Sequence, residues 1–130
     1  MAFTHKLPEA ARRNLRAADV LDEGHRRDVA GYLYGIAAEC AVKQMVIPLS
    51  LSPEHDKNAI FYAHFPELRT LLRDALKGRN MKPLTVFVFN DGFMNNWHVG
   101  MRYADAAQIL PGWVNAWRQQ ARDAVGAMGT

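Results

Sequence analysis

The stretch Val29–Ile47 constrains the fold most strongly, because it has the composition of a helix that lacks a polar face. Its only charged residues are Glu39 and Lys43. A helix that is apolar on all sides is normally buried on several sides, by other helices or by a second chain. An unpaired charge is costly in such surroundings. Glu39 and Lys43, one turn apart, are therefore predicted either to satisfy each other or to belong to a functional site.

Composition indicates one globular domain over residues 1–130. The chain is 49% hydrophobic and 22% charged, which is typical of a protein with its own core. A formal net charge of +3 permits nucleic-acid binding without requiring it. The single cysteine, Cys40, is predicted to be a small buried side chain in a cytoplasmic protein. Polar residues interrupt Val29–Ile47, so no membrane span is expected, and Met1–Glu9 lacks the apolar segment of a signal peptide.

Proline and glycine positions divide the chain into four main helices. Prolines favour the first turn of a helix and glycines lie just past its end. The predicted helices run from about Leu7 to Glu23, from His25 or Arg26 to Pro48, from Pro66 to Gly78, and from Leu110 to Met128. Short connections favour an all-α fold, an antiparallel bundle of these four helices.

Two segments between the helices are less regular. Ser52-Pro53-Glu54 resembles a helix start, so a short helix is expected there. Residues 79–101 are predicted to be irregular. Within them, Leu84–Phe89 has strand-like composition and precedes the turn signal Asn90-Asp91-Gly92, so a hairpin is one alternative. In a chain that is otherwise helical, we expect an ordered apolar loop or a short helix.

Three segments, in order, carry a family resemblance: Gly31–Lys43 (GYLYGIAAECAVK), His64–Leu68 (HFPEL) and Trp97–Tyr103 (WHVGMRY). On an all-helical chain of this length they resemble the HEPN domain family of prokaryotic helical-bundle proteins, and the resemblance covers most of the chain. It implies an up-and-down bundle that commonly dimerises, in toxin–antitoxin, phage-defence or RNA-processing systems. It also implies a nucleotidyltransferase as a partner.

Active HEPN nucleases resemble one another in an Arg-x4–6-His motif that serves metal-independent RNA cleavage. None of the five histidines here has an arginine five to seven positions before it. The resemblance therefore implies a non-catalytic module that binds RNA, a nucleotide or a nucleotidyltransferase-type partner. The alternative is a metal-independent ribonuclease with a non-standard site built from Arg102, Tyr103 and either His64 or His98. A structural or assembly protein without a ligand is a third option.

The segment from Trp97 to Tyr103 holds the densest polar and aromatic cluster. Arg102 offers a planar donor group for a phosphate or carboxylate, and Tyr103 offers a hydroxyl or a stacking face. In the functional interpretation these residues line a pocket beside the second helix, where Glu39 orients Arg102. In the structural interpretation Arg102 is a buried partner of Glu39 and the aromatic residues are core. His64 is either a base or ligand, or a side chain that packs at a helix start.

A basic ridge is predicted on the third helix, where Arg69, Arg73 and Lys77 recur every four residues. Such a ridge can follow a phosphate backbone, and the family resemblance makes RNA the expected target. The alternative is an ordinary solvated helix face, because acidic residues are interleaved with the basic ones.

No cofactor or metal site is predicted. The chain lacks the HExxH pattern, cysteine pairs and a glycine-rich phosphate loop. The adjacent His55 and Asp56 would need further ligands from elsewhere. The apolar second helix instead suggests a homodimer, for which Tyr34, Ala38 and Met45 are the expected contact residues.

Overall fold

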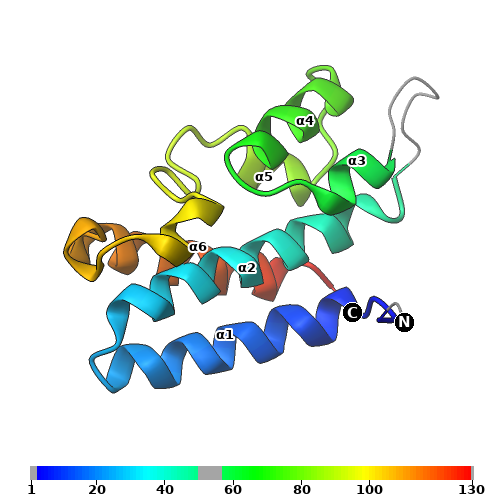
Figure 1. Cartoon of the computed structure of the whole chain (residues 1–130). Helices are drawn as coiled ribbons and strands as arrows, with labels where there is room; N and C mark the ends of the chain where they lie inside the picture. The colour runs from blue at the N-terminus through cyan, green and yellow to red at the C-terminus, as the bar shows by residue number, and fades with distance from the viewer. Residues whose placement is uncertain (1–2, 50–56, 130) are drawn as a thin grey trace.

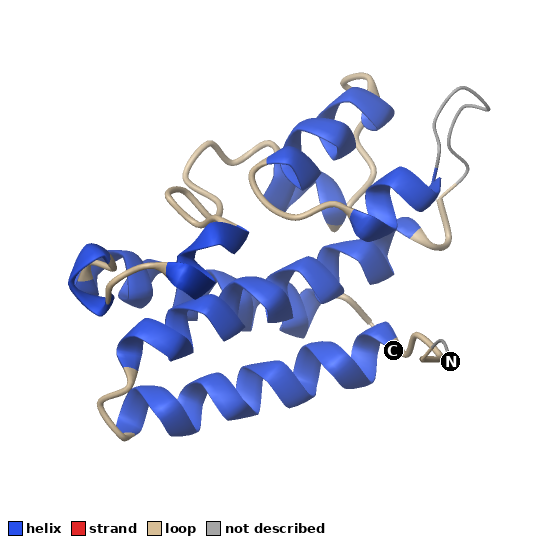
Figure 2. Ribbon diagram, viewed as in Figure 1, coloured by secondary structure: helices blue, strands red, loops and turns tan. Residues whose placement is uncertain are grey.

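The computed structural model describes residues 3–49 and 57–129, which contain helices and turns but no strand (Figure 2). The α-helices of these residues are α1 (Leu7–Glu23), α2 (Arg27–Val46), α3 (Lys57–Tyr62), α4 (Glu67–Leu76), α5 (Leu84–Val88) and α6 (Pro111–Ala127). Two 3-10 helices follow α5, namely η1 (Val99–Tyr103) and η2 (Ala106–Gln108). The all-α class is confirmed, and α1, α2, α4 and α6 are the four predicted long helices.

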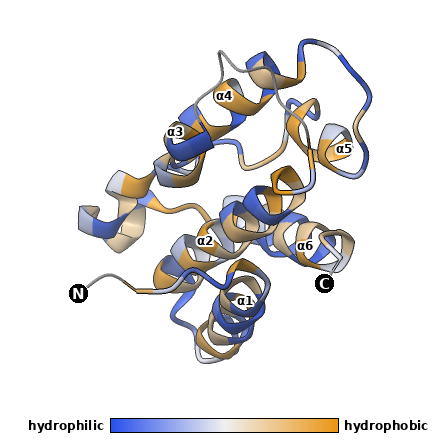
Figure 3. Cartoon of the chain, turned by 90° about the vertical axis from the view of Figure 1, so that its right-hand side faces the viewer, coloured by the Kyte–Doolittle hydropathy of each residue, from blue (hydrophilic) through white to orange (hydrophobic). Residues whose placement is uncertain are grey.

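Helix α2 lies at the centre of the molecule (Figures 1 and 3). Helices α1 and α6 pack against it, and α3, α4 and α5 lie on its other side. Helix α1 runs antiparallel to α2, whereas α6 runs in the same direction as α2 (Figure 1). Twelve of the 20 residues of α2 are buried. The apolar composition all round this helix therefore serves burial within one chain.

Two glycines allow α2 to contact tryptophans closely. A Cβ built on Gly35 would lie 1.9 Å from Nε1 of Trp97, and one on Gly31 would lie 2.9 Å from the ring of Trp117. The indole N–H of Trp97 donates to the carbonyl oxygen of Gly31 at 3.1 Å, so this buried polar group has its partner. The side chain of Trp97 is 1% exposed and belongs to the core, as the structural interpretation predicted.

The three residues expected at a homodimer contact lie in the core of the single chain. Tyr34 and Ala38 are fully buried and Met45 is 4% exposed within the single chain. The hydroxyl of Tyr34 donates to Asp19 of α1 at 2.6 Å. These side chains are unavailable to a second copy because the helices around α2 already cover them. Dimerisation itself stays a prediction.

The irregular segment contains one short helix. Leu84–Val88 forms α5, as expected, and the hairpin alternative is wrong. The helix start expected at Ser52-Pro53-Glu54 lies outside the described residues, as do His55 and Asp56. Across residues 3–49 and 57–129, no helix combines the length and the apolar character that crossing a membrane requires.

Candidate functional site

Helix α2 carries a buried carboxylate to the start of α4. Glu39 is 2% exposed. Its Oε1 lies 2.9 Å from Nδ1 of His64, and the backbone N–H of Phe65 donates to Oε2 at 2.8 Å. Both oxygens of Glu39 are therefore engaged by the segment just before α4. These contacts of Glu39 thus join two of the three segments that the sequence singled out, Gly31–Lys43 and His64–Leu68.

Glu39 does not pair with Arg102, although both interpretations of the cluster placed the two side chains together. Both carboxylate oxygens of Glu39 are bound by His64 and Phe65. Arg102 is exposed and its guanidinium carbon lies 5.7 Å from the ring centre of Tyr32 and 5.6 Å from that of Tyr103. Arg102 is thus a surface side chain held by aromatic rings, since η1 carries it away from the buried carboxylate.

Burial dominates the electrostatics of Glu39 and Lys43. It raises the pKa of Glu39, against the opposing effects of the hydrogen bonds from His64 and Phe65 and of the charge of Lys43. It also lowers the pKa of Lys43, and the carboxylate of Glu39 opposes this shift. Within the described part of the chain no ion pair joins the two side chains. The hydrogen bonds of Glu39 are therefore made with His64 and Phe65, and the ammonium group of Lys43 does not share them.

A pocket of about 340 Å³ brings His64 and His98 together. Tyr62, Ala63, Phe65, Pro66, Glu67 and Thr70 complete its lining. The ring of His98 accepts the backbone N–H of Gly100 on Nδ1 at 2.9 Å. The neutral form of His98 therefore carries its proton on Nε2.

The two histidines are held in opposite tautomers when Glu39 is ionised. The carboxylate then accepts the Nδ1 proton of His64, which leaves a lone pair on Nε2 of that ring. His64 thus presents a proton acceptor and His98 a proton donor. This pair is the arrangement that general acid–base chemistry needs, although no lysine or arginine lines this pocket.

Arg102 and Tyr103 belong to a separate surface. Arg102 lines a smaller pocket of about 190 Å³ together with Asp28, Tyr32 and Ile109. Tyr32 stacks on Trp97 at 5.7 Å between ring centres, so the buried tryptophan supports this surface from below. The side chain of Tyr103 is 84% exposed. The structure therefore divides the predicted cluster, with His98 on one pocket and Arg102 on another.

The predicted basic ridge is used within the fold. Arg69 donates from Nη1 to the carbonyl oxygens of Phe93 at 2.6 Å and Asp91 at 3.2 Å. Arg73 donates from Nε to the carbonyl oxygen of Val88 and from Nη2 to the Asp91 carboxylate at 3.0 Å. These hydrogen bonds connect α4 to the end of α5 and the segment after it. Arg69 and Arg73 therefore form neither a free phosphate-binding ridge nor a merely solvated helix face. Lys77 ends α4 in a left-handed conformation and is exposed.

Sequence reasoning missed a larger pocket of about 500 Å³ beside α1. Lys43 lines it, with Cys40 and residues of the N-terminal segment. The one signal in the sequence was Lys43 itself, a lysine within an apolar helix, which the sequence assigned either to Glu39 or to a functional site without indicating which residues surround it. The meeting of this lysine with residues 3–7 depends on tertiary contacts.

Metal-ligating side chains are dispersed in the described residues: no group of three or more histidine, cysteine, aspartate or glutamate side chains is placed to hold a metal ion. In comparisons with known proteins, no family model, no curated protein and no solved structure matches the chain.

Proposed function

We propose that this chain is a non-catalytic HEPN-like module that binds RNA or a nucleotide through the surface formed by Tyr32, Arg102 and Tyr103, hereafter the Arg–Tyr surface. The order of the three resembling segments and the all-helical fold support the family part of this proposal. The hydrogen bonds of Glu39 to His64 and Phe65 support it further, because they link two of those segments in space.

The observation that carries the proposal is the exposed Arg102, whose guanidinium lies over the rings of both Tyr32 and Tyr103. In the described residues no carboxylate lies within ion-pair distance of Arg102, and Asp28 of the same pocket is paired with Arg26. A guanidinium presents planar donors to a phosphate. The exposed ring of Tyr103 provides a face on which a base can stack.

Binding of labelled single-stranded RNA, measured by fluorescence anisotropy at two salt concentrations, tests this proposal. We expect Arg102→Ala and Tyr103→Ala each to weaken binding by about tenfold, since stacking and phosphate contacts contribute about 1–3 kcal/mol each. Arg102→Ala should also flatten the salt dependence. Arg16→Ala, an exposed arginine of α1, is the matched control. Equal weakening in Arg16→Ala and Arg102→Ala would contradict a specific surface.

The resemblance extends the proposal to assembly. A homodimer, or a complex with a nucleotidyltransferase-type partner in a defence, toxin–antitoxin or RNA-related system, would have to use side chains other than Tyr34, Ala38 and Met45, which are buried. Exposed apolar residues such as Val20, 68% exposed, are available for it. Light scattering of the purified chain at micromolar concentration measures the homodimer directly.

A metal-independent ribonuclease is the second candidate, and the opposite tautomers of His64 and His98 favour it. Nε2 of His64 would take the proton of a ribose 2′-hydroxyl, whose oxygen attacks the phosphorus. His98 would give the proton on its Nε2 to the departing 5′-oxygen, which leaves a 2′,3′-cyclic phosphate and a 5′-hydroxyl. This candidate ranks second because no lysine or arginine lines the pocket to stabilise the negative charge of the transition state.

The same RNA reactions, run in EDTA, separate the two candidates. Cleavage that disappears in both His64→Ala and His98→Ala, but persists in His25→Asn, would establish the ribonuclease. Binding without cleavage is the result that the non-catalytic module predicts.

A further inference from the structure

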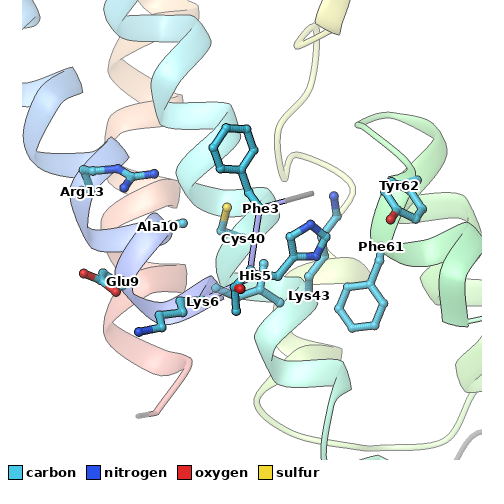
Figure 4. A pocket seen from close by; sticks show the side chains of 12 residues that line it. Phe3, His5, Lys6, Glu9, Ala10, Arg13, Cys40, Lys43, Phe61 and Tyr62 are labelled. Carbon is cyan, nitrogen blue, oxygen red and sulfur yellow. The ribbon is translucent and has the colours of Figure 1, made fainter. Parts of the chain in front are cut away.

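The pocket of about 500 Å³ lies where four parts of the chain meet (Figure 4). In Figure 4, Glu9 and Arg13 of α1 lie on one side, and Phe61 and Tyr62 lie on the other. Residues of the N-terminal segment and of α2, among them Phe3 and Lys43, complete the lining. The volume falls within the range of about 300–1,000 Å³ that small-molecule sites occupy.

Lys43 is the unusual group in this pocket. It is 7% exposed, yet within the described residues it makes no hydrogen bond and no ion pair. Glu39, one turn before it, gives both oxygens to His64 and Phe65. A buried ammonium group without an acceptor carries a desolvation cost, which a negatively charged oxygen placed in the pocket would offset.

The other residues that line the pocket indicate which class of ligand could bring a negatively charged oxygen to Lys43. Lys6 and Arg13 add positive charge, whereas Glu9 is the one acidic side chain among the lining residues. Phe3, Phe61 and the ring of Tyr62 add apolar surface. A pocket with a buried cation and aromatic walls suits a ligand with one anionic end and an apolar body. A singly charged carboxylate costs less to desolvate there than a doubly charged phosphate.

We propose that this pocket binds a small organic carboxylate with an aromatic or alkyl body, whose carboxylate contacts the ammonium group of Lys43. The guanidinium of Arg13 at the α1 side supplies a second positive charge. The apolar body lies against Phe61 and Tyr62. This site is independent of the Arg–Tyr surface, because the two pockets share no lining residue.

Isothermal titration calorimetry with 4-phenylbutyrate tests the proposal, with neutral 4-phenylbutanol as the matched ligand. The unmodified chain should bind the carboxylate at least tenfold more tightly than the alcohol. Lys43→Met keeps the length of the side chain and removes its charge, so it should weaken binding of 4-phenylbutyrate about tenfold and leave the alcohol unaffected. Lys82→Met, at an exposed lysine outside the pocket, is the control and should bind as the unmodified chain does.

Absence of 4-phenylbutyrate binding at millimolar concentration would overturn the proposal, as would equal binding of the acid and the alcohol. Both results come from the unmodified chain, so they hold even where Lys43→Met fails to fold. Unchanged binding of the acid to a folded Lys43→Met, judged by circular dichroism, would also overturn it. Nuclear magnetic resonance shifts confined to residues such as Ala10 and Phe61 are the expected signature of the ligand.

Discussion

Glu39 shows how a single buried carboxylate is accommodated. Its hydrogen bonds come from a histidine ring and from a backbone N–H, at 2.9 and 2.8 Å. Burial nevertheless raises its pKa, so the ionised form is disfavoured in the folded chain relative to water. The sequence predicted that this charge would need a partner, but it pointed to Lys43 or Arg102 rather than to His64. The spacing between residues 39 and 64 carries no information about a contact that depends on the packing of α4 against α2.

Substitution of Glu39 separates its hydrogen bonds from its charge. Glu39→Ala leaves the buried N–H of Phe65 without an acceptor, so we expect a loss of about 1–3 kcal/mol in the free energy of unfolding. Glu39→Gln keeps an acceptor oxygen. Because the folded-state pKa is raised, the unmodified chain loses stability as pH rises through it, and Glu39→Gln does not. The stability of Glu39→Gln relative to the unmodified chain should therefore increase between pH 4 and pH 8.

Urea denaturation at a series of pH values measures both effects. A difference between Glu39→Gln and the unmodified chain that stays constant with pH would show that Glu39 does not titrate in the way described.

At the scale of elements, α2 is defined by what packs on it. Gly35 of α2 contacts Trp97, and Gly31 contacts Trp117. Both tryptophans lie far from α2 in the sequence. The sequence predicted the helix and its burial. It did not indicate which side chains would cover it, because a helix that is apolar all round offers no preferred face. For the same reason Tyr34, Ala38 and Met45 were assigned to a dimer contact, although helices of the same chain cover them.

Gly35→Ala tests the closest of these contacts. The added Cβ would lie 1.9 Å from Nε1 of Trp97, so the indole ring would have to shift. The shift would disturb the hydrogen bond from this ring to the carbonyl oxygen of Gly31. We expect a destabilisation of about 3 kcal/mol, at the upper end of overpacking effects. Thermal unfolding followed by circular dichroism measures it.

Gly126→Ala is the matched control, because nothing lies within 4 Å of a Cβ at that position of α6. There the better helix propensity of alanine should stabilise the chain by about 0.5–1 kcal/mol. Equal effects of the two substitutions would mean that Trp97 does not pack on Gly35.

At the scale of the whole molecule, Asp22 joins three helices. From α1 it accepts hydrogen bonds from Arg27 of α2 at 2.7 Å and from Arg118 of α6 at 3.0 Å. Burial acts to raise the pKa of Asp22, but the hydrogen bonds and charges of the two arginines lower it overall. This aspartate therefore holds together the end of the molecule where α1 turns into α2.

Asp22→Asn should weaken this junction by about 2 kcal/mol, since hydrogen bonds to charged groups contribute about 1.5–3 kcal/mol. The folded-state pKa of Asp22 is lowered, so the stability that it contributes is present above its unfolded-state pKa and is lost as pH falls through the folded-state value. The difference between Asp22→Asn and the unmodified chain should thus shrink in acid.

Denaturant unfolding at pH 7 and below pH 4 measures this, with Asp74→Asn at an exposed position of α4 as the control. A loss in Asp22→Asn that is the same at both pH values would contradict the ionic part of the junction.

The helical class, the bounds of the long helices and the burial of α2 could be predicted from the sequence, because proline, glycine and apolar spacing act locally along the chain. Which side chains contact one another depends on the tertiary packing. Glu39 contacts His64 rather than Arg102. His98 and Arg102 line different pockets, and Lys43 lines a third pocket together with the N-terminal segment. These contacts depend on how the segments between the long helices pack against α2. The local spacing of residues in the sequence does not specify that packing.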